Sequence, residues 1–279
     1  METSFQSTRG LQLSSVQWLL DHHHAKEKER RKMVDDLRLG AGDRVLDSAS
    51  GPGLWSRLFA EKVHPGGRVV ALDFSPELID HARATLRDDP LGGVVDPVLG
   101  EFNLLPFDRG AFDAVFLGNC FCYVDDVPAV LEQHKQVTRV GGRVISKEFD
   151  GGAVIFYPLD PALTLKVLTG AAQLLADGAS TSRFDNFVGR KMHGMFLRTG
   201  FTDVSTRSYA IQKVAPLSPA TKRYIRSNAE WYGRMALPYL SDDEQCRWAG
   251  AFDPSSDACI LDRPDFYFSM IETVTEGTA

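Results

Sequence analysis

The 279-residue chain has few cysteines, no excess of basic residues and no long apolar run. Its four cysteines are too scattered for a disulfide framework, which predicts reduced thiols and a cytoplasmic location. Lys and Arg total 31 against 37 Asp and Glu, so we expect no nucleic-acid partner. The basic run KEKERRK (26–32) contains two glutamates, which indicates a solvated helix face. No stretch approaches the ~18 apolar residues that cross a bilayer, and METSFQSTRG lacks the pattern of a signal peptide, so no membrane partner is expected.

Short β-rich runs alternate with helical stretches along most of the chain. Strands are expected at residues 44–48, 68–73, 94–100, 112–118, 142–149, 200–214 and 266–275. Helices are expected near residues 54–63, 76–87 and 127–139. The alternation predicts an α/β fold with a doubly wound, Rossmann-like sheet of seven strands. Most of these strands are expected to be parallel and the last one antiparallel.

The remaining segments divide the chain further. We expect an N-terminal helical cap at 1–40, a cofactor-binding core at 41–150 and a helical lid at 151–199. Residues 200–279 are expected to complete the sheet, with a helical insertion at 216–252. The leading helix and this insertion are natural places for subunits to meet, so a homo-oligomer is expected.

The stretch RVLDSASGPG (44–53) ends the first strand of the predicted sheet. Ligands of doubly wound sheets bind at the carboxyl ends of the strands. Gly51 and Gly53 leave room for a ligand at the backbone, and the helix that follows offers free N–H groups. Asp73 ends the second strand, where its carboxylate can accept both hydroxyls of a ribose, and Phe74 can flank a purine.

Two nucleoside cofactors fit this arrangement. A dinucleotide requires G-x-G-x-x-G and an acid about 20 residues later. Here Ser56 stands in place of the third glycine, and Pro52 removes an N–H donor from the loop. Asp47 would also repel a pyrophosphate, whereas it would attract an ammonium or sulfonium group. We therefore expect S-adenosylmethionine, and an NAD-dependent dehydrogenase is the less favoured interpretation.

At this point the sequence resembles the class I S-adenosylmethionine-dependent methyltransferases, particularly small-molecule enzymes of the ubiquinone/menaquinone-biosynthesis type. VLDSASGPG matches the family's V-L-D-x-G-x-G-x-G loop, and GRVVALDFSPELIDHAR matches its ribose motif. GEFNLLPFDRGAFDAVFLGN and RVGGRVISKEF match two further motifs in the same order. The resemblance covers residues 42–149 well and RTGFTDV (198–204) more weakly.

The resemblance implies a residue for each part of the cofactor, with S-adenosylhomocysteine as the product and no metal. These residues are Asp47, Ala49, Ser50, Gly51 and Gly53 for the methionine part, Asp73 for the ribose, Phe74, Glu101, Phe102 and Asn103 for the adenine, and Gly118 and Asn119 near the sulfonium. Two positions depart from the family pattern. Ala49 replaces the first glycine, and Glu101 is one carbon longer than the usual aspartate.

The catalytic residues are less evident. A general base is needed only when the acceptor must lose a proton. Many relatives have a histidine after the fourth strand, but GNCFCYVDD (118–126) has none. Tyr123 and Glu148 are the candidate bases, with aromatic packing and a surface salt bridge as the respective alternatives. The histidines at 22–24 cannot converge on one metal ion, because consecutive helical side chains diverge by ~100°; they are expected to be exposed or to pack between helices.

Aromatic residues are dense outside the common sheet. The candidate substrate residues are Trp18, Phe121, Phe156, Tyr157, Tyr224, Trp231 and Tyr232. They predict an apolar cavity for a lipophilic aromatic, polyketide or terpenoid metabolite of secondary metabolism. The absence of an evident strong base favours carbon over oxygen as the acceptor atom. An alternative keeps the fold without methyl transfer: a cyclase that retains the cofactor as a structural element.

Overall fold

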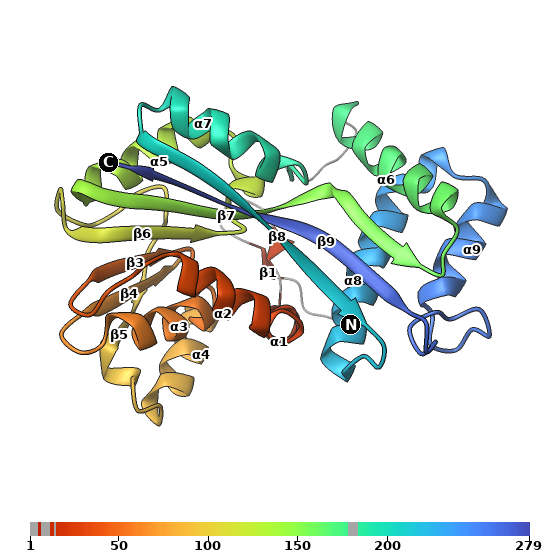
Figure 1. The fold of residues 1–279 in the computed structure, drawn as a ribbon, viewed down its shortest axis with the longest axis horizontal. Coiled ribbons are helices and arrows are strands. Elements are labelled where there is room, and N and C mark those ends of the chain that lie inside the picture. Colours follow the sequence, from red (N-terminus) through yellow and green to blue (C-terminus); the bar gives the residue numbers. More distant parts are fainter. Residues whose placement is uncertain (1–4, 7–11, 14, 178–183) are drawn as a thin grey trace.

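The computed structural model describes residues 5–6, 12–13, 15–177 and 184–279. A seven-stranded sheet of order β5-β4-β3-β6-β7-β9-β8 runs along its long axis (Figure 1). The strands are β3 (Arg44–Ser48), β4 (Arg68–Asp73), β5 (Val95–Leu99), β6 (Phe112–Gly118), β7 (Thr138–Tyr157), β8 (Thr202–Val214) and β9 (Tyr267–Thr278). β3 to β7 are parallel, and β9 is antiparallel to both of its neighbours. The predicted fold class is confirmed. A separate pair, β1 (Phe5–Gln6) and β2 (Gln12–Leu13), was not predicted.

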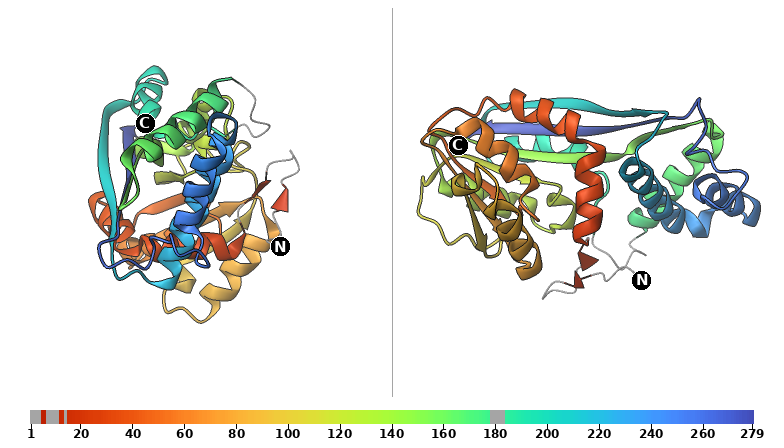
Figure 2. Two further views of the ribbon diagram at one scale, coloured as in Figure 1. Left: turned by 90° about the vertical axis from the view of Figure 1, so that its right-hand side faces the viewer. Right: turned by 90° about the horizontal axis from the view of Figure 1, so that it is seen from below.

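The helices form three groups around this sheet (Figures 1 and 2). One face carries α1 (Val16–Ala25), α2 (Glu27–Asp36), α3 (Leu54–Val63) and α4 (Pro76–Arg87), and the other carries α5 (Val127–Val137) and α7 (Met192–Arg198). α6 (Pro161–Ala176), α8 (Pro219–Ala236) and α9 (Asp242–Phe252) gather at the far end of β7 and β9. Short 3₁₀ turns are η1 (Gly92–Val94), η2 (Phe121–Tyr123), η3 (Val188–Lys191) and η4 (Leu237–Tyr239). No helix of the described ranges is long and apolar enough to cross a membrane.

Local chemistry explains where these helices begin. Ser15, Ser75 and Ser218 each accept a hydrogen bond from a backbone N–H of the first turn, which satisfies a donor that the helix leaves free. Ser241 and Glu244 form a reciprocal capping box at α9. The parallel strands are apolar on both faces: Val45 and Leu46, consecutive in β3, pack into different hydrophobic clusters.

The predicted helical lid was wrong at its beginning. Residues 151–157 continue β7, so that Phe156 and Tyr157 lie in a strand and not in a helix. The register of β7 against β9 shifts between Asp150 and Val154, which marks a bulge around the two glycines. A side chain at Gly151 would collide with Asn186, whose carbonyl accepts the Gly151 N–H at 2.8 Å. The two glycines therefore do not end the strand: Gly151 lets the backbone of Asn186 approach β7 closely.

Candidate functional site

Two carboxylates lie at the ends of the neighbouring parallel strands β3 and β4. Asp47 is buried and accepts the Ser56 hydroxyl at 2.5 Å; burial raises the pKa of Asp47 to about 7. Asp73 accepts the backbone N–H groups of Gly51 at 2.8 Å and Ser75 at 2.9 Å, and burial raises its pKa as well. Each oxygen of Asp73 takes one of these donors, which leaves lone pairs on both oxygens for further hydroxyl donors.

The loop between β3 and α3 is held in a conformation that suits glycine. Gly51 and Gly53 have positive φ angles of 58° and 77°, and Ser50 N–H donates to the Leu72 carbonyl of β4 at 2.9 Å. Ala49 also lies in the left-handed region, at φ 58°. This conformation costs a non-glycine residue about 1–2 kcal/mol. The substitution at the family's first glycine therefore strains the backbone of the loop.

The residues predicted around the adenine lie beside the end of β4. Gly100 N–H donates to the Asp73 carbonyl at 2.9 Å, which brings residues 101–103 next to that strand end. Glu101 is exposed, and Phe102 and Asn103 are half-buried, as is Phe74. The structure therefore places this predicted group together. We call the ends of β3, β4 and β6, with residues 49–53 and 100–103, the cofactor edge.

The end of β6 is fixed to β7 at two points. Asn119 N–H donates to the Lys147 carbonyl at 2.8 Å, and Lys147 Nζ donates to Asn119 Oδ1 at 3.0 Å. Asn119 has a φ of 58°, which asparagine tolerates better than most residues. A side chain at Gly118 would lie 2.9 Å from the Phe116 ring. Gly118 and Asn119 therefore form a close-packed end to the cofactor edge.

Glu148 is a buried carboxyl and not a surface salt-bridge residue. Its Oε1 accepts the backbone N–H groups of Cys120 at 3.1 Å and Phe121 at 3.0 Å, whereas its buried Oε2 has no hydrogen-bond partner among the residues that the structure describes. Burial raises the pKa of Glu148 to about 8, so the group exchanges a proton close to neutral pH. Burial raises the pKa of Tyr123 far above its usual range, which disfavours the phenol as a base.

Four half-buried aromatic rings form a cluster that includes Tyr123, and the 3₁₀ turn η2 that carries Tyr123 also donates a backbone N–H to Glu148. The ring of Phe184 lies 5.1 Å from Tyr123, 6.1 Å from Phe149 and 5.5 Å from Trp231. We call these four residues the aromatic wall. Tyr123 and Trp231 belonged to the predicted site, but Phe149 and Phe184 were missed. No local pattern identifies Phe149, because consecutive side chains of a strand point to opposite faces of the sheet.

The structure distributes the other predicted substrate residues over several environments. Phe156 packs in the core against Phe252 and Trp248, whereas Tyr157 points to the opposite, exposed face of β7. Phe121, Tyr224 and Tyr232 are also buried. The Tyr224 hydroxyl donates to Met270 Sδ, and the Tyr232 hydroxyl donates to the Gly151 carbonyl. Trp18 stacks on His22. The Tyr232 ring lies 5.1 Å from Trp231 of the wall.

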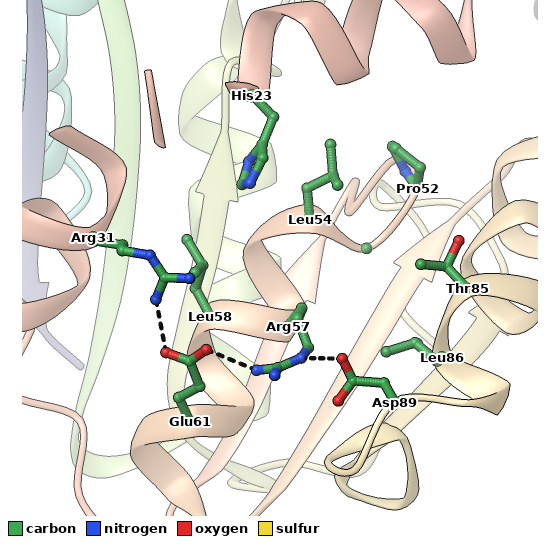
Figure 3. Close-up of a pocket in the computed structure, with 11 residues that line it drawn as sticks. His23, Arg31, Pro52, Leu54, Arg57, Leu58, Glu61, Thr85, Leu86 and Asp89 are labelled. Carbon is green, nitrogen blue, oxygen red and sulfur yellow. Dashed lines mark hydrogen bonds and ion pairs between the residues drawn. The ribbon is translucent and has the colours of Figure 1, made fainter. Parts of the chain in front are cut away.

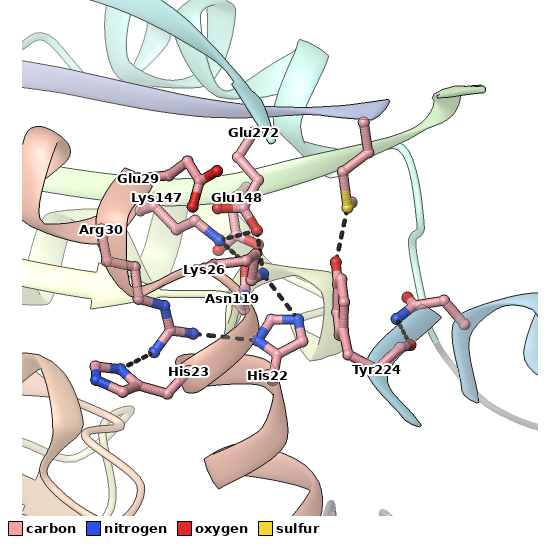
Figure 4. A network of polar contacts seen from close by, with 12 residues as sticks. His22, His23, Lys26, Glu29, Arg30, Asn119, Lys147, Glu148, Tyr224 and Glu272 are labelled. Carbon is pink, nitrogen blue, oxygen red and sulfur yellow. Dashed lines mark hydrogen bonds and ion pairs between the residues drawn. The ribbon is translucent and has the colours of Figure 1, made fainter. Parts of the chain in front are cut away.

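A buried ionic network, shown in Figure 4, was not predicted. Lys26 and Lys147 are fully buried and share Glu272 Oε1, at 2.5 and 2.7 Å. Lys26 also contacts His22 Nε2 at 2.9 Å, and Arg30 contacts the rings of both His22 and His23. The solvated face predicted for residues 26–32 was therefore wrong for Lys26 and Arg30. Their partners on β7 and β9 are distant in the sequence.

A cavity of about 240 Å³ is lined by residues of α3 together with residues of α1, α2 and α4 (Figure 3). Pro52, Gly53 and Leu54 form one part of its lining, and His23 of α1 faces them. The charged side chains that line the cavity form ion pairs with one another: Glu61 pairs with Arg31 and Arg57, and Arg57 also pairs with Asp89. The cavity therefore offers no unpaired charge to a ligand.

Comparison with known proteins agrees with this geometry. Residues 46–146 match the methyltransferase domain family. The demethylmenaquinone methyltransferase of Oceanobacillus iheyensis is 29% identical over 187 residues, which cover 64% of this chain and 78% of that protein. The ubiquinone/menaquinone biosynthesis C-methyltransferase of Geobacter sp. strain M21 is 29% identical, with coverage of 63% and 77%. Several other curated relatives are matched over only about half of their length, 48–55%.

Solved structures show the same fold. The YcgJ protein of Bacillus subtilis superposes with a TM-score of 0.57 at 17% identity, over 92% of this chain and 98% of that one. Residues 46–146 thus match a methyltransferase domain, and the domain, the relatives and the fold together support a class I S-adenosylmethionine-dependent methyltransferase of the ubiquinone/menaquinone-like type.

Proposed function

We propose that this protein transfers a methyl group from S-adenosylmethionine to a lipophilic small molecule, with Glu148 as the general base. The observation that supports this most is the buried Oε2 of Glu148, which has no hydrogen-bond partner among the described residues. Glu148 accepts the backbone N–H of Phe121 in η2, the turn that carries Tyr123, and its charge contributes to the raised pKa of Tyr123. The candidate base is therefore close to Tyr123 of the aromatic wall.

The cofactor edge has the donors and acceptors that S-adenosylmethionine requires. Asp73 retains lone pairs for the two ribose hydroxyls. Asp47 has a hydroxyl partner in Ser56 and, within the described ranges, no cationic hydrogen-bond partner, which suits a carboxylate that binds an ammonium group. When bound, S-adenosylmethionine supplies a methyl group on a positively charged sulfur that retains the bonding electron pair after transfer.

The acceptor is proposed to be aromatic, polyketide or terpenoid in character. The four rings of the aromatic wall are half-buried, so they retain apolar surface that a flat or prenylated substrate can cover. A phenol oxygen and a ring carbon both lose a proton during methylation, and a carboxylate with a pKa of about 8 can accept it from either. The relative named a C-methyltransferase supports carbon as the acceptor atom.

Turnover of a substrate panel tests this proposal. Purified protein is incubated with S-adenosylmethionine and with quinols, prenylated phenols, polyketides or small polar amines, and S-adenosylhomocysteine and methylated product are quantified together. The proposal predicts equimolar formation of both with the lipophilic compounds. Preference for the polar amines, or cyclised product without S-adenosylhomocysteine, would overturn it.

A further inference from the structure

Arg30 of α2 is a buried cation that forms no ion pair with any described residue. It is 5% exposed, and its guanidinium contacts His23 Nδ1 at 2.8 Å and His22 Nδ1 at 3.1 Å (Figure 4). Both imidazoles are neutral, because burial and the neighbouring cations lower the pKa of each ring. Within the described part of the chain Arg30 forms no ion pair, and its buried Nε has no hydrogen-bond partner. A buried charge of this kind is costly unless an anion binds it.

The carboxylate of this network, Glu272, pairs with two lysines and not with Arg30. Glu272 Oε1 accepts both Lys26 and Lys147, at 2.5 and 2.7 Å. Glu148 directs its Oε1 at two backbone N–H groups and contacts no lysine or arginine among the described residues. Among the described residues the network therefore contains three buried basic side chains and one ion-paired carboxylate, and Arg30 is the basic side chain without an ion pair.

The surroundings of Arg30 lie at the methionine end of the cofactor edge. Its guanidinium lies 4.8 Å from the ring of Trp55, in the first turn of α3, and its charge lowers the pKa of Asp47. Helix α1 covers the adjoining loop, because Leu19 Cδ1 would lie 3.7 Å from a side-chain carbon at Gly51. Arg30 and Asp47 thus flank the same loop with opposite charges.

We propose, on the basis of the proposed function, that Arg30 binds the carboxylate of the methionine moiety of S-adenosylmethionine. Arginine suits this role because its planar guanidinium donates two parallel hydrogen bonds to one carboxylate. Asp47 and Arg30 then bind the ammonium and the carboxylate of a single amino-acid group. The N-terminal helices α1 and α2 are, on this account, part of the cofactor site.

A pair of ligands that differ only in this carboxylate tests the assignment. S-adenosylhomocysteine and its decarboxylated analogue, S-(5′-adenosyl)-3-thiopropylamine, are titrated calorimetrically into the wild type, Arg30→Gln and Arg31→Gln. A charge-assisted hydrogen bond corresponds to a preference for S-adenosylhomocysteine of roughly 10- to 100-fold in the wild type. Arg30→Gln should lose this preference and bind the analogue as tightly as the wild type does. Arg31→Gln is the matched control, because Arg31 is half-exposed and pairs with Glu27 and Glu61.

The outcomes separate this inference from the proposed function. A wild type that binds both ligands equally, or an Arg30→Gln protein that keeps the preference or loses affinity for both ligands alike, overturns the role of Arg30 alone. A wild type that binds neither ligand overturns the cofactor assignment itself. Hydrogen exchange of the wild type needs no variant: S-adenosylhomocysteine should protect residues 16–36 more than the analogue does, and equal protection contradicts the inference.

Discussion

The cofactor edge takes its acidic groups from two strand ends that are adjacent in the sequence, whereas the aromatic wall combines rings from four separate segments. Asp47 and Asp73 end consecutive strands, and each is followed by a turn into a helix. Tyr123, Phe149, Phe184 and Trp231 come from η2, β7, the segment before η3, and α8. The residues of the cofactor edge can be predicted from the local spacing of strands and turns in the sequence. The aromatic wall forms only when segments that are distant in the sequence fold together.

The largest effect on kcat is expected when the candidate base, Glu148, is removed. We expect Glu148→Gln to lower kcat by about 10²- to 10⁴-fold, because the amide cannot accept the acceptor's proton. Wild-type kcat should fall as the pH decreases below about 8, since the carboxyl is then protonated. Stopped assays across pH 6–10 measure both effects. A variant with wild-type kcat and an unchanged pH profile would contradict the role of Glu148.

The same carboxyl predicts a pH dependence of stability. Its pKa is about 8 in the folded protein against an ordinary value of 4.5, so the folded state binds this proton more tightly. This contribution to stability is complete below pH 4.5 and is lost as the pH rises through 8. Urea melts at pH 6 and pH 9 should show a smaller decrease in unfolding free energy for Glu148→Gln than for the wild type. Equal decreases would argue against the buried carboxyl.

At the cofactor edge, Asp73→Ala should weaken S-adenosylhomocysteine binding by about 100-fold. Two charge-assisted hydrogen bonds to the ribose are lost, and we take about 1.5 kcal/mol for each, the lower end of the usual range. Calorimetric titration measures this change. Asp80→Ala, on the exposed surface of α4, is the control and should bind as the wild type does. An Asp73→Ala protein with affinity within threefold of the wild type would remove Asp73 from the site.

At the aromatic wall, Trp231→Ala should raise KM for a lipophilic acceptor by about tenfold, because substrate contact with the ring is lost. Affinity for S-adenosylhomocysteine should not change, which distinguishes the wall from the cofactor edge. Tyr157→Ala is the matched control, since that ring is exposed on the opposite face of β7. Steady-state kinetics would contradict the assignment if both variants raised KM equally.

The smallest effect is expected in the strained loop. Ala49→Gly should stabilise the protein by up to about 1 kcal/mol, because glycine adopts the positive φ without strain but loses more entropy on folding. Ala60→Gly, in the interior of α3, is the opposite control and should destabilise by about 1 kcal/mol. Thermal melts compare the two variants. A destabilised Ala49→Gly would show that Ala49 is not strained.

The contrast between the two regions also explains what could be predicted from the sequence. The bounds of α3 and α4 were predicted correctly, because capping residues and apolar spacing are local. The continuation of β7 to Tyr157 was missed, because the pairing that supports it comes from β9, at the far end of the chain. The buried state of Lys26 and Arg30 was missed for a similar reason: Lys26 pairs with Glu272, which no local pattern connects to it.

The most direct test of the account is a calorimetric titration of purified, ligand-free protein with S-adenosylhomocysteine, with NAD as the comparison. The account predicts saturable binding of one molecule per chain and no heat with NAD. Absence of heat with S-adenosylhomocysteine, or binding of NAD in its place, would contradict the assignment of the cofactor edge.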